Sequence, residues 1–362
     1  MRRDSASRVD YGEQAGSAGS FRRRPLPGAG FGAELRFDAA DSRLAVTAVE
    51  ADPGPLRCAF YDSQGLLVMK DMHTITQEPE LLVRVSRVFG PEVENYHETL
   101  TARNMIHPSV PEILVLSNLP PSNREPPPEP DPPRTADGGL PVQFPHRKGW
   151  HTDQSFRRPP PDISLFYAVI PTPKGQGQTL YGDGVAAYEA LSIDQKKRIE
   201  RLEGVHVLPW TGRSEEAVRA GETPKPLLPH QRPQRQPVVR VHPVTGKRAL
   251  YLCEDAQMDW IEGPIANMTP GPDGEGAALI YGLMAHFTQP RFTYAHEWDQ
   301  GDLVIYDNRC LIHSGTWFDS ARHERLMWRT TVMGNPGPEY VGEKRSWIPD
   351  SGGRPMQGLD YS

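Results

Sequence analysis

The sequence predicts a β-rich (α+β) barrel or jelly roll that carries helices, and three features predict it. The apolar runs along the chain are mostly short, as strands are. Only a few segments space their apolar residues as an amphipathic helix does. Proline and glycine, 38 and 33 of the 362 residues, break the chain at short intervals, which is typical of turn-rich β folds.

The composition argues against several classes of protein. The net charge is −6 and no long run of Lys or Arg occurs, so no nucleic-acid partner is expected. The apolar runs fall short of the roughly 18 residues of a membrane helix, so no membrane partner is expected either. Cys58, Cys253 and Cys310 lie far apart without a CxxC motif, which argues against a disulfide framework or a zinc knuckle. This pattern and the lack of an apolar secretory segment favour the cytoplasm.

The first part of the chain, residues 1–27, is expected to be a disordered leader, because it is rich in Arg, Ser and Gly and almost lacks periodic apolar positions. Structure is expected to begin near Phe31. The apolar run Leu66–Met69 predicts a short buried strand. Helical spacing of apolar residues over 81–89 predicts a helix, which Gly90 ends.

Two proline-rich segments, residues 120–141 and 223–237, interrupt the rest of the chain. Proline lacks a backbone donor and fixes φ, so we interpret both segments as extended surface loops. Apolar runs and turn residues predict further strands over 113–116, 163–170, 303–306 and 325–333, and a hairpin of 238–242 with 249–253. Further helices are predicted over 185–191, from a Ser192 and Gln195 capping box to near Gly204, and over 275–287.

The motif Trp150-His151-Thr152-Asp153 is the first candidate for chemistry. On a strand, residues i and i+2 point to the same side, so His151 and Asp153 can reach one metal ion together. A further histidine would complete the set of two histidines and one carboxylate that suits non-heme Fe(II) and leaves positions open for a co-substrate and O2. Taken alone, the motif is also compatible with a surface or structural histidine.

His313 is the candidate for the distal ligand, because it ends an apolar segment that follows the strand over 303–306. A core histidine that binds no metal is the alternative. Arg325 and Arg329 are an even step apart, so on a strand they share one face. Two arginines on the inner face of a barrel require anions, and a guanidinium pairs well with a carboxylate or sulfonate. A solvent-facing edge strand is the alternative for this pair.

Four stretches of sequence then complete an ordered pattern: 149–156 (GWHTDQSF), 178–191 (QTLY through AAYEAL), 298–313 (WDQGDLVIYDNRCLIH) and 325–331 (RLMWRTT). Together they resemble the taurine dioxygenase and aryloxyalkanoate dioxygenase (TauD/TfdA) family of Fe(II)/2-oxoglutarate enzymes, over roughly residues 30–335. The resemblance implies a double-stranded β-helix, a cupin-like jelly roll with helical insertions. It also implies a single oxygenase domain over 28–345, followed by a C-terminal tail over 346–362.

The resemblance further implies the metal, the co-substrates and the reaction. His151, Asp153 and His313 match the catalytic iron ligands of the family. The implied cofactors are Fe(II), 2-oxoglutarate as co-substrate, and O2. The implied reaction couples oxidative decarboxylation of 2-oxoglutarate, to succinate and CO2, with hydroxylation of an unactivated C–H bond in a small anionic or natural-product substrate. Because related halogenases lack the carboxylate at the position of Asp153, hydroxylation is favoured over halogenation.

Four other positions match family residues that bind the co-substrate or the substrate. Thr179 and Arg325 match the threonine and arginine that bind the distal carboxylate of 2-oxoglutarate. Arg329 matches a second arginine, near the 2-oxoglutarate or the anionic end of the substrate. Gln154 matches a position near the substrate.

Several alternatives stay open at the level of sequence. The same iron core supports desaturation, epoxidation or another oxidation, and a catalytically silent cupin-type binding protein is the alternative outside enzymes. The sequence decides neither the substrate nor the oligomeric state, although relatives are commonly dimers or tetramers. The loop over 120–141 is longer and richer in proline than the family pattern and leads directly to the metal motif. We therefore expect it to shape the substrate entrance.

Overall fold

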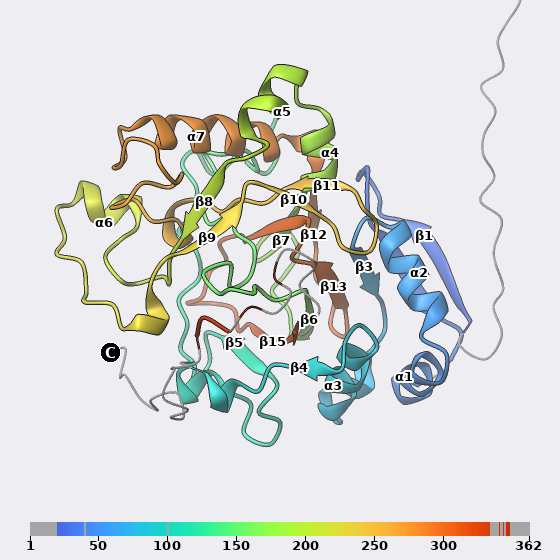
Figure 1. The fold of residues 1–362 in the computed structure, drawn as a ribbon. Coiled ribbons are helices and arrows are strands. Elements are labelled where there is room, and N and C mark those ends of the chain that lie inside the picture. Colours follow the sequence, from blue (N-terminus) through green and yellow to red (C-terminus); the bar gives the residue numbers. More distant parts are fainter. Residues whose placement is uncertain are drawn as a thin grey trace, which may run out of the picture.

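An eight-stranded mixed sheet forms the centre of the computed structural model, which describes residues 20–39, 41–99, 101–333, 340, 343 and 345–347 (Figure 1). Its strands lie in the order β1 (Phe21–Pro25), β2 (Ala33–Phe37), β3 (Leu66–Met69), β13 (Leu303–Asp307), β6 (Ile163–Ile170), β15 (Leu326–Met333) and β4 (Glu92–Val93), and β5 (Leu114–Ser117) also pairs with β15. All neighbours are antiparallel except β2 and β3, which are parallel.

Three smaller sheets accompany the large one. The first contains β12 (Thr293–His296), β7 (Thr179–Asp183) and β14 (Leu311–Gly315), in that order. The others are the pairs β10 (Val239–Val241) with β11 (Arg248–Leu250) and β8 (Glu203–His206) with β9 (Gln234–Pro237).

The helices form two groups on opposite sides of these sheets (Figure 1). One group comprises α1 (Ser42–Ala51), α2 (Gly54–Asp62) and α3 (Glu80–Arg87). The other comprises α4 (Gly184–Glu189), α5 (Ile193–Ile199) and α7 (Glu275–Phe287), with α6 (Glu215–Arg219) nearby. Short 3₁₀ helices cover His73–Thr76, Tyr96–Glu98, Arg103–Met105, Pro229–Gln231, Asp255–Gln257 and Pro290–Phe292.

Three apolar cores show that the molecule is layered. One core lies between helices α1 to α3 and the outer face of the large sheet, with Leu82 and Trp328 among its members. A second lies between the two larger sheets and includes Phe166 of β6 and Leu311 of β14. A third lies behind the three-stranded sheet, where Phe287 of α7 packs. The two larger sheets therefore face each other across a shared interior.

The structure confirms the predicted β-rich fold with helices. The strands over 66–69 and 163–170 and the helix over 275–287 have the predicted bounds, and the Ser192 and Gln195 capping box is present. The strand and helix predictions around 113–116, 185–191, 238–253, 303–306 and 325–333 are confirmed within a few residues. Residues 120–141 contain neither helix nor strand, as predicted.

Three expectations about the chain's organisation were wrong. Of the expected leader over 1–27, residues 1–19 lie outside the described residues, but 21–25 form β1, because their backbone pairs with β2 and Phe21 packs against Phe37. The end of the loop over 223–237 forms β9, which pairs with β8 despite its terminal proline. The helix expected to end near Gly204 ends at Ile199, because β8 already begins at Glu203.

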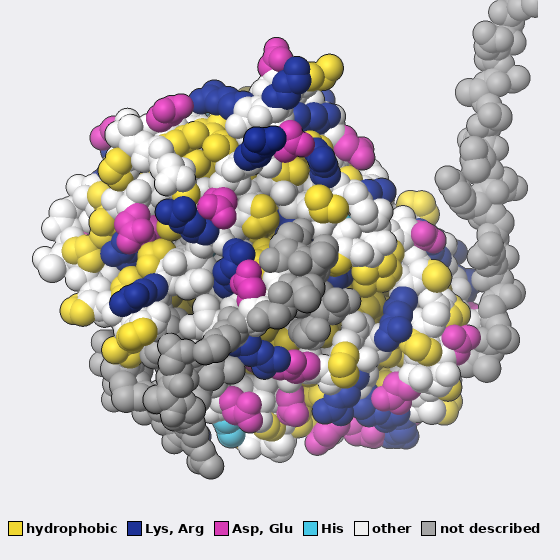
Figure 2. Space-filling view, in the orientation of Figure 1, with side chains coloured by type: hydrophobic (Ala, Val, Ile, Leu, Met, Phe, Trp, Pro, Cys, Tyr) yellow, Lys and Arg dark blue, Asp and Glu magenta, His cyan; other side chains and the backbone are white. Residues whose placement is uncertain are grey.

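The surface agrees with a nearly balanced charge. Lys and Arg side chains are interspersed with Asp and Glu on the face drawn in Figure 2. Among the described residues, no helix is both long enough and apolar enough to cross a membrane.

Candidate functional site

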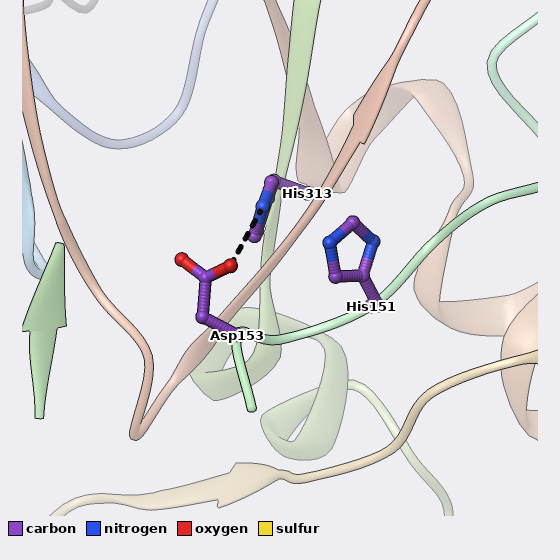
Figure 3. A group of neighbouring side chains, drawn as sticks. All are labelled: His151, Asp153 and His313. Carbon is purple, nitrogen blue, oxygen red and sulfur yellow. Dashed lines mark ion pairs between the residues drawn. The ribbon is translucent and has the colours of Figure 1, made fainter. Parts of the chain in front are cut away.

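His151, Asp153 and His313 meet between the two larger sheets (Figure 3). One potential ligand atom from each lies within 4.8 Å of the others, and His313 Nε2 is 3.8 Å from Asp153 Oδ1. His313 lies on β14, and its backbone exchanges two hydrogen bonds with that of His151, at 2.9 and 2.7 Å. The expected strand around 150–153 is therefore reduced to a single bridge at His151. Asp153 follows in a turn.

Both imidazoles are suited to bind a cation. The Nδ1 of His151 donates to the carbonyl of Gly149 at 2.8 Å, so its Nε2 carries the free lone pair. Burial, followed by the neighbouring His151, lowers the pKa of His313 to about 3. Burial also lowers the pKa of His151. Both rings are therefore neutral near pH 7, which is the form that ligates metals.

Asp153 is held as a carboxylate by three donors. Its Oδ2 accepts hydrogen bonds from the hydroxyls of Ser164 and Tyr306, both at 2.7 Å, and its Oδ1 accepts one from Arg329. Burial by itself would raise the pKa of Asp153, but the guanidinium of Arg329 and the hydrogen bond from Ser164 hold it well below its usual range. The site thus keeps one fixed negative charge beside two neutral imidazoles.

Asn308, in the turn between β13 and β14, fixes the segment that carries Asp153. Its Oδ1 accepts from the Asp153 N–H at 3.2 Å, and its carbonyl accepts from the Thr152 hydroxyl at 2.8 Å. Its Nδ2 donates to Ser164 Oγ at 2.9 Å, and Ser164 in turn donates to Asp153. We did not single out Asn308 from the sequence, although it lies within the stretch that resembles the TauD/TfdA pattern.

The donor set fits a divalent iron ion. Two neutral imidazoles and one carboxylate form the facial set typical of non-heme Fe(II), and the buried Nδ1 of His313 has no hydrogen-bond partner among the described residues. His242, Asp307 and Cys310 also lie close together. That group is already satisfied, because Asp307 accepts two hydrogen bonds from the Arg309 guanidinium, one from the Arg309 N–H and one from His242 Nε2.

Arg325 lies in the same interior between the two larger sheets, and its positive charge has no anionic partner among the described residues. Its Nε is buried and has no hydrogen-bond partner among the described residues. Burial, and then the positive charge of Arg124, lowers the pKa of Arg325 to about 10. A buried guanidinium in this condition is a binding site for an anion, since leaving it unpaired costs free energy.

Thr179 belongs to the same region through an aromatic contact. It is buried at the start of β7, and its hydroxyl accepts a hydrogen bond from Trp298 Nε1 at 3.1 Å. The Trp298 ring packs edge-on against Phe166 at 5.2 Å between centroids, and Arg325 lies 5.7 Å from the centre of that phenyl ring. The hydroxyl proton of Thr179 is free to donate to an oxygen of a ligand.

Arg329 and Gln154 make contacts that the sequence did not indicate. Arg329 forms an ion pair with Asp153. The Nε2 of Gln154 donates to Glu94 at 2.8 Å, and its Oε1 accepts from Arg157 at 2.8 Å. Both ends of the Gln154 amide are therefore occupied by protein groups in this structure.

Comparisons with known proteins identify relatives of this chain. The family model described as "Taurine catabolism dioxygenase TauD, TfdA family" matches residues 22–331. The chain is 33% identical over 183 residues to an alpha-ketoglutarate-dependent 2,4-dichlorophenoxyacetate dioxygenase of Burkholderia sp. (strain RASC), a match that covers 51% of this chain and 57% of that protein. It is 28% identical over 328 residues to pentalenolactone F synthase of Streptomyces arenae, covering 88% and 98% of the two chains.

Solved structures share the fold. The structure of AAD-2 in complex with Mn(II) and N-oxalylglycine matches with a TM-score of 0.61 and 26% identity, over 87% of this chain and 98% of that one. A taurine dioxygenase from Burkholderia xenovorans matches with a TM-score of 0.58 and 24% identity, over 88% and 92%. The matches with three of the aryloxyalkanoate-type relatives span 57 to 64% of those relatives' lengths.

Proposed function

The chain belongs to the taurine catabolism dioxygenase TauD, TfdA family, and on that premise we propose that it is an Fe(II)/2-oxoglutarate-dependent oxygenase. It couples decarboxylation of 2-oxoglutarate, to succinate and CO2, with hydroxylation of a C–H bond in a small substrate. The buried group of His151, Asp153 and His313 is the observation that carries this proposal. Two neutral imidazoles beside an ionised carboxylate are the donor set that this chemistry requires.

In this proposal His151, Asp153 and His313 hold Fe(II), which supplies the redox chemistry that activates O2 together with 2-oxoglutarate. The remaining residues of the site bind and orient 2-oxoglutarate and the substrate. Arg325 and Thr179 bind the distal carboxylate of 2-oxoglutarate, because they offer an unpaired buried cation and a free hydroxyl proton.

The contacts of Arg329 and Gln154 favour supporting roles. Arg329 neutralises Asp153 and fixes one of its two oxygens, so we propose that it positions this ligand. Binding of 2-oxoglutarate or substrate by Arg329 stays a prediction. The same holds for substrate contact by Gln154, whose amide would have to leave Glu94 and Arg157 to make one.

The finer structural expectations also remain proposals. Two larger sheets that face each other across an apolar interior support a double-stranded β-helix. We further propose that residues 28–345 form one oxygenase domain and that 346–362 form a tail, which lies largely outside the described residues. The three free cysteines are compatible with the cytoplasm as its compartment. A dimer or tetramer is the assembly that we propose by analogy with the family.

The relatives suggest the range of substrates and outcomes. Their names include a 2,4-dichlorophenoxyacetate dioxygenase and a pentalenolactone F synthase, so aryloxyalkanoic acids and terpenoid natural products are the first compounds to test. Desaturation, epoxidation or another oxidation by the same site is the alternative outcome. Product analysis separates these outcomes, because desaturation removes two hydrogens and adds no oxygen, while epoxidation adds one oxygen across a C=C bond and hydroxylation inserts it into a C–H bond.

The proposal is tested by succinate formation. Purified protein supplied with Fe(II), ascorbate and 2-oxoglutarate should release succinate, and an added substrate should accelerate that release. His151→Ala should abolish it, because one of three ligands is lost. Full succinate release by His151→Ala would refute the ligand set. No release by the wild-type protein with any compound would favour a cupin-type binding protein.

A further inference from the structure

We propose that Arg124, carried by the proline-rich loop of residues 120–141, binds the anionic group of the substrate. The inference rests on the proposed function, since it concerns the substrate of that same site. It identifies Arg124 as a residue that determines substrate specificity. It also predicts the substrate class, which is organic acids whose carboxylate, sulfonate or sulfate ester forms an ion pair with the Arg124 guanidinium.

The start of the proline-rich loop is fixed beside Arg325. The Arg124 N–H donates to the carbonyl of Ser117 at 2.8 Å, and the Ser117 hydroxyl donates to the carbonyl of Arg325 at 2.7 Å. The side chain of Asn118 accepts a hydrogen bond from the Arg325 N–H at 2.8 Å. The segments that carry the two arginines are therefore joined through Ser117, which bonds to the main chain of both.

The loop then crosses the edge of the three-stranded sheet. A Cβ placed on Gly315 of β14 would lie 3.5 Å from the ring of Pro127, so this proline covers that position. Gly315 is the register partner of Thr179 on β7. The loop thus passes from the arginine to the threonine that we assign to the co-substrate, and it borders the site along the way.

The Arg124 side chain is accessible and has no anion. It is exposed, and it makes no hydrogen bond or ion pair with any residue that the structure describes. Surrounding protein, followed by the charge of Arg329, nevertheless lowers the pKa of Arg124. The Arg124 guanidinium therefore reaches solvent while it feels the charge of Arg329, so an entering ligand can meet it there.

A count of charges shows why the substrate must bring an anion. Arg124, Arg325 and Arg329 interact electrostatically, but Asp153 is the one carboxylate among the described residues that forms an ion pair with any of them. With Fe(II) and the dianion 2-oxoglutarate bound, an excess of about two positive charges remains. Arg325 and Asp153 then each have a partner, and Arg124 is the accessible cation that lacks one.

The positions of the two free arginines decide between substrate and co-substrate. Arg325 immediately precedes strand β15 and is enclosed, as suits a co-substrate that is the same in every turnover. Arg124 is exposed on the loop, as suits a contact specific to one substrate. The planar guanidinium binds carboxylates and sulfonates through two parallel hydrogen bonds.

Calorimetry on the loaded protein tests the proposal. Mn(II) and N-oxalylglycine fill the metal and co-substrate sites, and phenylacetate or benzenesulfonate is then titrated in, with benzyl alcohol as the neutral probe. At least one anion should bind the wild-type protein more tightly than benzyl alcohol. Arg124→Gln should weaken that binding by roughly tenfold, because a charged hydrogen-bond donor is lost. Arg134→Gln, a change to another exposed arginine of the same loop, should leave it unchanged.

The outcomes separate this inference from the proposed function. If Arg124→Gln binds the anions as well as the wild-type protein does, or if neither anion binds the wild-type protein, the inference is overturned. A loss of N-oxalylglycine affinity in Arg124→Gln as large as that in Arg325→Gln would assign Arg124 to the co-substrate instead. Failure of the wild-type Mn(II) protein to bind N-oxalylglycine would count against the proposed function. Titrating the anions into the wild-type and Arg124→Gln proteins without N-oxalylglycine would then still show whether Arg124 binds them.

Discussion

Replacing Asn308 by alanine should weaken metal binding without touching a metal ligand. The change removes two side-chain hydrogen bonds, that from Asp153 N–H at 3.2 Å and that to Ser164 at 2.9 Å, while the Thr152 hydroxyl keeps its bond to the main-chain carbonyl of residue 308 at 2.8 Å. At about 1 kcal/mol for the bond to Ser164, and about 1–3 kcal/mol for the Asp153 N–H that stays buried and unpaired, the unfolding free energy should fall by about 2–4 kcal/mol.

The effect on the metal follows from the freedom that Asp153 gains. Both its backbone N–H and its Oδ2 partner Ser164 depend on Asn308, so the carboxylate is held less firmly against the two histidines, although Tyr306 and Arg329 still contact it. The loss of such an outer contact typically weakens metal affinity by about 10- to 100-fold. Calorimetric titration with Mn(II) measures this affinity, and urea unfolding measures the stability.

A control variant separates positioning from general destabilisation. Leu82→Ala empties a fully buried position on α3, in the core on the far side of the large sheet, and should cost about 2–5 kcal/mol. It should keep the wild-type Mn(II) affinity. If Asn308→Ala also keeps that affinity while it is destabilised, Asn308 serves stability alone and the positioning role is refuted.

Three further predictions concern the co-substrate, a buried acid and the loop. Arg325→Ala should raise the KM for 2-oxoglutarate by about 100-fold or more with no loss of melting temperature, because its buried charge has no protein anion; an unchanged KM would contradict its role. Burial raises the pKa of Asp183, the N-cap of α4, to about 6, so its stabilising contribution is present at low pH and is lost as the pH rises through 6. The free energy of unfolding of Asp183→Asn, measured in urea relative to that of the wild-type protein, should therefore rise by about 2 kcal/mol between pH 4 and pH 7.5. The same relative value at both pH values would show that the pKa of Asp183 is not raised. Replacing residues 123–138 by a short Gly/Ser linker should change which compounds accelerate succinate release while N-oxalylglycine still binds; unchanged selectivity would remove the loop from the substrate entrance.

The main elements and the candidate ligands His151 and Asp153 could be predicted because each has a local signature. The strands over 66–69 and 163–170 are short apolar runs, and the helix over 275–287 has helical spacing. His151 and Asp153 are two residues apart, so any compact backbone keeps them close together. The prediction that His313 joins this pair rested on the order of motifs along the chain. In the structure, a backbone bridge to His151 places His313 beside His151 and Asp153.

The remaining features depend on contacts between distant segments, for which the sequence has no local signal. Strand β1 is polar apart from Phe21 and exists because β2 offers an edge to pair with. Arg329 and Asp153 are 176 residues apart, and only the folded β15 brings the guanidinium to the carboxylate. The position of Arg124 could not be predicted either, since nothing in the sequence of a proline-rich loop indicates that the start of the loop lies next to Arg325.

The metal content of the protein tests the central claim most directly. After incubation with Fe(II) under anaerobic conditions and removal of unbound metal, the wild-type protein should retain one iron ion per chain. His313→Ala and His151→Ala should retain almost none, while His242→Asn, in the other cluster of potential ligands, should retain one. Retention of iron by both His151→Ala and His313→Ala, or its loss in a folded His242→Asn protein alone, would contradict the proposed site.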